Sequence, residues 1–341
     1  MWDVPERSES PLIQIRDAVW RPTPASMRLL AALGVIVNTG IIVTGGAVRL
    51  TKSGLGCPTW PKCTGDSLVP TAHNAHAGLN QAIEFGNRLL TFLVLAVGVL
   101  VFVAALRLLP RRRDVLRLAA VQPLSVFAQA IMGAITVLTK LHPATVSAHF
   151  LMSIALLAAA VWLYVRTTEG DRAPRPLVRS ELVWLGRGLL GVVAVLLLLG
   201  TIVTGTGPHA GDDEARRYGF DIEQVAQLHA DAVWLTVGLT FALLLGLRLT
   251  GAPARAQKRA VVLLLVELSQ GAIGYIQYWT NVPPVLVGAH MLGAALVWIA
   301  TLRVLFALRD RGPVPAPPSP NPSPSAPGPV PAAEDSPVTT T

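Results

Sequence analysis

Eight long apolar segments constrain this chain more than any other feature of its sequence. Each is close to the roughly 20 residues that a helix needs to cross the hydrocarbon core of a bilayer. They lie at about 28–48, 83–106, 115–138, 144–165, 183–206, 224–247, 259–279 and 285–308. An apolar soluble bundle would need a polar face on most helices, and residues 94–106 and 189–199 have none. The sequence therefore predicts an all-α integral membrane protein with eight transmembrane helices.

The positive charges gather in alternate loops, around residues 107–117, 166–187 and 248–259. Since Lys and Arg accumulate in loops that remain in the cytoplasm, both termini are predicted to be cytoplasmic and the protein to be a multi-pass protein of a bacterial plasma membrane. The same topology explains the formal net charge of +8. The expected partner is therefore membrane lipid, and no nucleic-acid motif is present.

The chain contains an internal repeat of a four-helix unit. A shift of 141 residues makes nine of the 23 positions from 129 to 151 identical. At a shift of 160, Ile42-Val-Thr-Gly45 matches Ile202-Val-Thr-Gly205, and a longer insert in the first outer loop accounts for the difference between the shifts. The repeat indicates two pseudo-symmetric four-helix bundles.

The repeat divides the chain into five parts. We expect a cytoplasmic N-terminal segment at 1–27, an N-terminal bundle at 28–166 with an outer cysteine loop at 49–82, a cytoplasmic linker at 167–182 and a C-terminal bundle at 183–309. Residues 310–341 are rich in Pro, Ala and Ser with few large apolar residues, which predicts a disordered cytoplasmic tail.

Three histidines, His149, His229 and His290, fall inside predicted helices near their outer ends. A histidine within a membrane helix is usually paired or functional. His229 and His290 would face each other across the second bundle, as the two axial ligands of a haem iron do. Hydrogen bonding between helices is the alternative, and zinc is disfavoured because two imidazoles do not complete a tetrahedral site.

The first bundle differs from the second at the matching positions. His149 is retained there, but the repeat aligns Asn87 with His229. A single strong ligand leaves one face of an iron open for chemistry. Glu84 lies one helical turn before Asn87, and Arg88 follows it. Glu84 is either a proton-handling group beside the reacting centre or an interfacial charge and partner of Arg88.

Cys57 and Cys63 are the two cysteines of the chain, and the predicted topology places both outside the membrane, where disulfides persist. We expect a bridge between them, which would either pin the loop or take part in thiol exchange or haem handling. The sequence has no pair of cysteines followed by histidine, so a haem would be held without thioether bonds.

Several of these stretches resemble the heme A synthase family. They are Thr44-Gly-Gly-Ala-Val-Arg49, Ser53-Gly-Leu-Gly-Cys-Pro-Thr-Trp-Pro-Lys-Cys63, Ile83-Glu-Phe-Gly-Asn-Arg88, Ala148-His149 and Ala289-His290. The resemblance implies an oxidoreductase that converts a methyl group of the substrate haem O to the formyl group of haem A, for assembly of cytochrome c oxidase, with electrons delivered through a haem b cofactor.

By the same resemblance, His229 and His290 are the haem b ligands and His149 is an iron ligand in the haem O half. Glu84 is the acidic residue beside that site, with Asn87 and Arg88 also part of it, and Cys57 and Cys63 match the family's extracellular pair. Asn87 departs from the family, in which many members have a second histidine at this position. The loop residue His76 is an alternative ligand for that face of the iron.

Two other functions compete with this interpretation. A membrane electron-transfer cytochrome of the b type would need haem b without a substrate, and a transporter would need broken helices or charge pairs near the midplane. The resemblance also makes haem O synthase, the protohaem farnesyltransferase, an expected partner. The electron donor, the oxygen source and any homo-oligomer are left open by the sequence.

Overall fold

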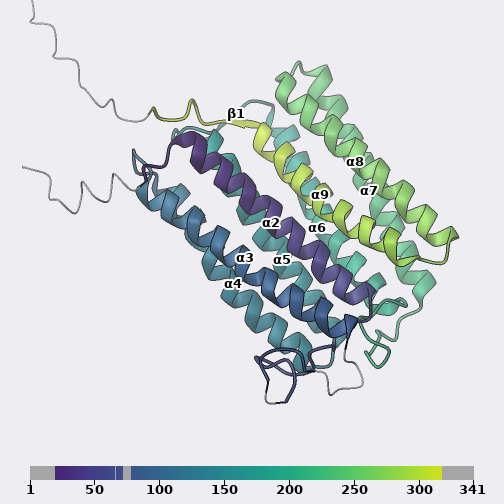
Figure 1. The fold of residues 1–341 in the computed structure, drawn as a ribbon. Helices are drawn as coiled ribbons and strands as arrows, with labels where there is room; N and C mark the ends of the chain where they lie inside the picture. The colour runs from purple at the N-terminus through teal and green to yellow at the C-terminus, as the bar shows by residue number, and fades with distance from the viewer. Residues whose placement is uncertain (1–19, 66, 72–77, 317–341) are drawn as a thin grey trace, which may run out of the picture.

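The fold consists of eight long helices that run alternately up and down. A computed structural model describes residues 20–65, 67–71 and 78–316, and Figure 1 shows the arrangement. All eight predicted helices are confirmed, and each is long and apolar enough to cross a membrane. They are α2 (Pro24–Leu50), α3 (Leu79–Arg107), α4 (Arg113–Leu138), α5 (Pro143–Thr168), α6 (Ser180–Thr206), α7 (Ile222–Leu249), α8 (Ala254–Trp279) and α9 (Pro284–Ala307).

The helices begin slightly earlier than the apolar segments that predicted them, and polar caps account for this at α2 and α7. The side chain of Thr23 accepts a hydrogen bond from Ser26 N in a capping box at the start of α2. Asp221 accepts hydrogen bonds from Glu223 N and Gln224 N at the start of α7. Proline occupies a first-turn position of α2, α5 and α9, where its missing N–H has no partner to lose.

The helices form two four-helix bundles, α2 to α5 and α6 to α9, as the repeat predicts. Within each bundle every helix packs on its sequence neighbours, and the last helix packs on the first. Helices α5 and α9 pack directly on each other between the bundles, while α2 contacts α9 and α5 contacts α6. Figure 1 shows α3 and α4 on one side of this central layer and α7 and α8 on the other.

The core is continuous across the two bundles. Its largest cluster combines Ile154 and Leu157 of α5 with Leu243 of α7 and Leu263 of α8. Across the same interface the indole N–H of Trp298 donates to the carbonyl oxygen of Ile154 at 3.0 Å. Many of the large apolar side chains on α3, α4, α7 and α8 are exposed, as lipid-facing side chains are.

Both described ends of the chain lie at the same end of the molecule (Figure 1). There β1 (Arg175–Pro176), within the predicted linker, pairs antiparallel with β2 (Arg309–Asp310). The backbone N–H of Gly170 also donates to Gly312 O at 2.8 Å. Ordered contacts therefore extend past residue 309 to the first residues of the predicted tail, and residues 317–341 lie outside the described part.

A buried arginine ties this end together. The Arg166 side chain is 2% exposed and forms ion pairs with Asp114, with Glu169 at 3.2 Å and with Asp171 at 3.0 Å. Arg309, at the end of α9, pairs with Glu169 at 3.1 Å. The network joins α4, α5 and the strand that follows α9. Arg166 is one of the basic residues that predicted the topology, and Arg309, which is not, joins the second bundle to Glu169.

Candidate functional site

The second bundle brings His229 of α7 and His290 of α9 together, as the sequence predicts. Their ring centroids are 6.4 Å apart and the ring planes make an angle of 62°. The Nδ1 atom of each ring is buried and has no hydrogen-bond partner. The backbone of Leu196 on α6 still interacts with the His229 ring, so hydrogen bonding between helices and haem ligation both stay predictions.

Glycines on the neighbouring helices leave room beside the two rings. A Cβ added to Gly274 on α8 would lie 3.6 Å from His290 Cε1, and one added to Gly200 on α6 would lie 3.3 Å from His229 Cε1. Gly293, a small residue near His290 in the sequence, instead makes room for the Gln270 side chain. The glycines that flank the rings are thus on α6 and α8.

The first bundle reproduces the His290 arrangement around His149. A Cβ added to Gly133 would lie 3.6 Å from His149 Cε1, the same distance as between the repeat-related Gly274 and His290. The Nδ1 atom of His149 is also buried without a partner. The repeat in the sequence is therefore a repeat of the histidine environment.

Two repeat-related glutamines hold the backbone of these histidines. Gln270 Nε2 donates to His290 O at 2.8 Å. Gln129 Nε2 donates to Ser153 Oγ at 2.9 Å, and that hydroxyl donates to His149 O at 3.0 Å. The glutamines were present in the repeat, but sequence reasoning did not assign them a role.

Asn87 is held by α2. Its Oδ1 accepts a hydrogen bond from Thr44 Oγ1 at 2.8 Å, and a Cβ added to Gly45 would lie 3.9 Å from Asn87 Nδ2. A Cβ on the next residue, Gly46, would lie 2.4 Å from Met291 Cε. The Thr44-Gly-Gly46 motif thus contacts Asn87 of the first bundle and the residue after His290 of the second.

Glu84 and Arg88 form the ion pair that was one of the two sequence interpretations. Arg88 Nη2 lies 2.8 Å from Glu84 Oε1. The other carboxylate oxygen, Glu84 Oε2, accepts a hydrogen bond from Cys57 N at 2.6 Å. Both oxygens of this buried carboxylate are therefore engaged, and its proton-handling role stays a prediction.

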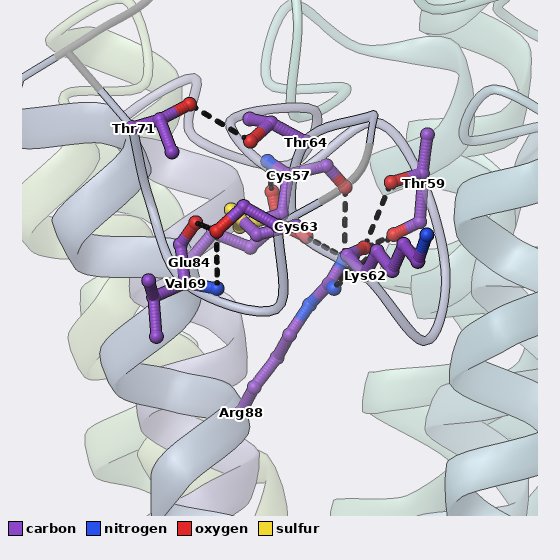
Figure 2. Close-up of a disulfide and its surroundings, with 10 residues drawn as sticks. Cys57, Thr59, Lys62, Cys63, Thr64, Val69, Thr71, Glu84 and Arg88 are labelled. Atoms are coloured by element: carbon purple, nitrogen blue, oxygen red, sulfur yellow. Dashed lines mark hydrogen bonds and ion pairs between the residues drawn. A yellow bond between two sulfur atoms is a disulfide. The ribbon is translucent and has the colours of Figure 1, made fainter.

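Arg88 also holds the cysteine loop. Its guanidinium donates to Cys57 O at 2.8 Å, to Thr59 O at 3.2 Å and to Lys62 O at 3.3 Å. Cys57 and Cys63 form the predicted disulfide, and both are fully buried. Figure 2 shows Glu84 and Arg88 reaching from α3 into this loop. The two residues therefore dock the cross-linked loop on the end of α3.

The loop histidines that the structure describes have other contacts. His142 accepts a hydrogen bond from Ala144 N at the start of α5, and a ring nitrogen of His209 lies 2.8 Å from Val282 O. His73 and His76 lie outside the described residues, so the suggestion of His76 as an alternative ligand stays a prediction. Among described residues no three His, Cys, Asp or Glu side chains are grouped as a metal site requires.

Sequence reasoning did not indicate two further polar residues of the helices as site candidates, Arg49 and Glu267. Arg49 bridges the bundles, since its Nη2 donates to Thr204 O at 2.8 Å, at the C-terminal end of α6. Glu267 is a buried carboxyl in α8. A lone charged residue inside an apolar segment is a signal that could have identified Glu267.

Residues 28–211 match the family model of COX15-CtaA, a cytochrome oxidase assembly protein. The match covers more than half of the chain. The chain belongs to this family. The matched residues include Glu84, Asn87 and His149 but end before α7, so the proposed ligands His229 and His290 rest on the internal repeat and on their geometry.

Similar proteins include three bacterial heme A synthases. The one from Shewanella oneidensis is 27% identical over 185 residues, which are 52% of this chain and 54% of that protein. The one from Lysinibacillus sphaericus is 32% identical over 179 residues, 52% of this chain and 55% of that protein. For the one from an Exiguobacterium species the identity is 31% over 137 residues, 39% of this chain and 42% of that protein.

The chain thus spans about half of the length of the relatives it matches. Together with the eight spanning helices, these bacterial relatives identify a multi-pass membrane protein of the heme A synthase family.

Proposed function

We propose that this protein is a heme A synthase, an oxidoreductase that converts a methyl group of haem O to a formyl group and so supplies haem A for cytochrome c oxidase. Family membership supports the class of reaction. The observation that carries the proposal is the asymmetric repeat: two half-buried imidazoles face each other in one bundle, and His149 has Asn87 in place of a second histidine in the other.

In the second bundle, His229 and His290 would hold haem b. Two closely spaced imidazoles with unpartnered Nδ1 atoms, and glycines beside the rings, are a donor set that fits haem. When bound, this haem would supply one-electron transfer. The protein would hold the two imidazoles in place through the Gln270 contact to the His290 backbone.

In the first bundle, the substrate haem O would be bound through His149. Gln129 and Ser153 hold the His149 backbone, and Thr44 holds Asn87. These contacts would orient the substrate so that one ring methyl group points toward the site of oxidation. The apolar surroundings would exclude oxidation at other positions of the substrate. Glu84 would handle protons from the loop end of α3, with Arg88 holding its carboxylate.

Electrons would pass from the second bundle to the first across the contact between α5 and α9. These two helices carry His149 and His290 and pack directly on each other. The Trp298 hydrogen bond to Ile154 O fixes their relative position. The packing of α5 on α9 therefore supports contact between the two proposed halves.

The cellular setting is proposed from charge and chemistry. The end that carries both described ends of the chain is rich in basic residues, which supports a cytoplasmic position for it, and the disulfide loop would then lie outside. Membrane lipid would cover the exposed apolar side chains. Haem O would be received from the protohaem farnesyltransferase that makes it, because a free haem is poorly soluble in water.

A b-type electron-transfer cytochrome is the second candidate function. Arg88 and Cys57 N bind both oxygens of Glu84, which fits a structural role for this carboxylate. A cytochrome without a substrate would need Glu84 only in such a role. The two functions differ in whether the protein changes a haem.

The deciding experiment is chromatography of haems extracted from the purified protein after expression with a source of haem O. We expect haem A or its hydroxylated precursor from the wild type. We expect His290→Ala to lose the product and the second-bundle haem. His209→Ala, which alters a loop histidine, is the matched control and should keep both.

Glu84→Gln and Arg88→Gln separate the two interpretations of Glu84. Both variants break the ion pair, but Arg88→Gln retains the carboxylate. If Glu84 handles protons, Glu84→Gln abolishes product formation while Arg88→Gln keeps a measurable part of it. Equal losses in the two variants would assign Glu84 to loop docking, and haem b as the sole haem of the wild type would favour the cytochrome.

A further inference from the structure

Glu267 is a buried carboxyl group with no charged partner. It lies within α8 and is 4% exposed. Its Oε1 accepts a hydrogen bond from Thr240 Oγ1 of α7 at 2.9 Å, and its Oε2 is buried without any hydrogen-bond partner. Such a group inside a membrane helix is expensive and calls for a functional explanation.

The surrounding helices offer no cation to balance a negative charge on this carboxyl. Thr240 is the polar side chain that faces it from α7. Among the described residues, none of the ionisable side chains of α7, α8 and α9 is paired with Glu267: Glu223, His229, Asp231, Arg248, Arg255, Lys258, Arg259, Tyr275, Tyr278, His290 and Arg303. Because an unpaired carboxylate is strongly disfavoured in apolar surroundings, the arrangement fits an uncharged acid that carries a proton.

Glu267 shares a face of α8 with the residue that contacts a proposed haem ligand. Gln270 lies three residues further along α8, on the same face of the helix. Its Oε1 is also buried without a partner, while its Nε2 donates to His290 O at 2.8 Å. Gln270 Oε1 packs against Gly293 of α9, and a protonated Glu267 Oε2 is a buried donor one helical turn away on the same face of α8.

The carboxyl belongs to the second bundle alone. The 141-residue shift that aligns Gln270 with Gln129 aligns Glu267 with the buried Val126 of α4. The first bundle therefore shares the glutamine but has an apolar side chain in place of the acid. If the second bundle carries electrons, the charge of its interior changes with each electron. In a low-dielectric interior such a change is stabilised when a nearby carboxyl group such as Glu267 takes up or releases a compensating proton.

We propose that Glu267 is a proton-binding site coupled to the electron carried by the second bundle, an inference that rests on the proposed haem b site. When a one-electron reductant supplies one electron to the haem iron, water supplies one proton to Glu267 Oε2. When the electron leaves for the first bundle, the proton returns to water. The positive charge of the oxidised iron favours the carboxylate, and reduction removes that charge.

The test is a potentiometric titration of the haem in the purified protein at several pH values. In the wild type the midpoint potential falls as the pH rises, because reduction takes up a proton. In Glu267→Gln, which cannot ionise, this slope is lost while the haem remains bound. Thr236→Val is the matched control, since this buried α7 hydroxyl donates to Ala232 O of its own helix, and it keeps the slope.

An infrared spectrum gives a second readout that does not depend on activity. Reduction of the wild type should produce a carboxylic-acid C=O band that shifts in heavy water and is missing in Glu267→Gln. If the pH dependence of the midpoint potential is the same in Glu267→Gln as in the wild type, the proposal is overturned. If the variant does not fold, the wild-type infrared spectrum decides, and the absence of the carboxylic-acid band overturns the proposal. A second bundle that binds no haem would instead overturn the proposed function and, with it, the coupling.

Discussion

At the scale of single residues, Asn87 is one of the positions at which the two halves differ. The repeat aligns Asn87 with His229, and the structure shows that Asn87 is fixed by Thr44 of α2. An amide that accepts a hydrogen bond from a neighbouring helix is a weak iron ligand compared with imidazole, so among the residues that the structure describes His149 is the proposed ligand of the first bundle. The contrast follows from one position in a scaffold that otherwise repeats the histidine, glycine and glutamine.

Loss of the Thr44 hydroxyl should loosen this position. We expect Thr44→Val to lower the free energy of unfolding by about 0.5–1 kcal/mol, the usual net value of one hydrogen bond between side chains. Thr39→Val is the control, because Thr39 Oγ1 donates to Val35 O of its own helix. Unfolding in detergent would be followed by circular dichroism.

A double-mutant cycle with Asn87→Ala isolates the interaction. If the effects of Thr44→Val and Asn87→Ala simply add, the hydrogen bond contributes nothing to stability and this account of Asn87 fails.

At the scale of elements, short polar segments connect the two bundles at the end of the molecule that carries β1 and β2. Helices α5 and α9 lie side by side, but the linker and the residues after α9 lock them through the β1–β2 pair and the contacts of Arg166 and Arg309 to Glu169. Sequence reasoning used Arg166 as a marker of topology and did not consider Arg309. The Arg309 side chain is ion-paired because the fold brings it into contact with Glu169, 140 positions earlier in the chain.

Gly170 is the tightest point of this junction. A Cβ added there would lie 2.3 Å from Pro313 O and 2.5 Å from Arg311 O, which are backbone atoms that must shift. We expect Gly170→Ala to cost about 1–3 kcal/mol locally and to speed proteolysis near residues 309–316. Limited proteolysis in detergent, followed by mass spectrometry, measures this.

Gly188→Ala is the matched control, because an added Cβ on this α6 glycine meets nothing within 4 Å. It should leave the proteolysis unchanged. Equal rates for wild type and Gly170→Ala would show that the linker does not hold the residues that follow α9.

At the scale of the whole molecule, the two ends differ in the polar contacts that they hold. The end that carries both described termini holds the Arg112, Arg166 and Arg309 network, and the opposite end holds the disulfide loop, which is joined to the next outer loop by Gly54 N donating to Gly211 O at 2.9 Å. In a bacterial plasma membrane the basic end should face the cytoplasm.

Cysteine labelling in whole cells tests this orientation. Both native cysteines are in the buried disulfide, so an introduced cysteine is the one reactive thiol. We expect Glu214→Cys to react with a membrane-impermeant maleimide added outside, and Arg175→Cys to react only after the membrane is permeabilised. The reverse pattern would invert the proposed topology and place the disulfide loop in the reducing cytoplasm.

The sequence alone determined the eight spans, the two bundles and the positions of the three histidines, because helix length, charge bias and the repeat are local or periodic properties of a chain in a membrane. It also indicated the cysteine bridge. It could not decide between the two roles considered for Glu84, since the ion pair with Arg88 and the bond to Cys57 N depend on how the loop folds back on α3. Nor did it reveal the unpaired state of Glu267 or the α5–α9 contact. These features depend on which side chains meet across helices, and only tertiary packing decides that.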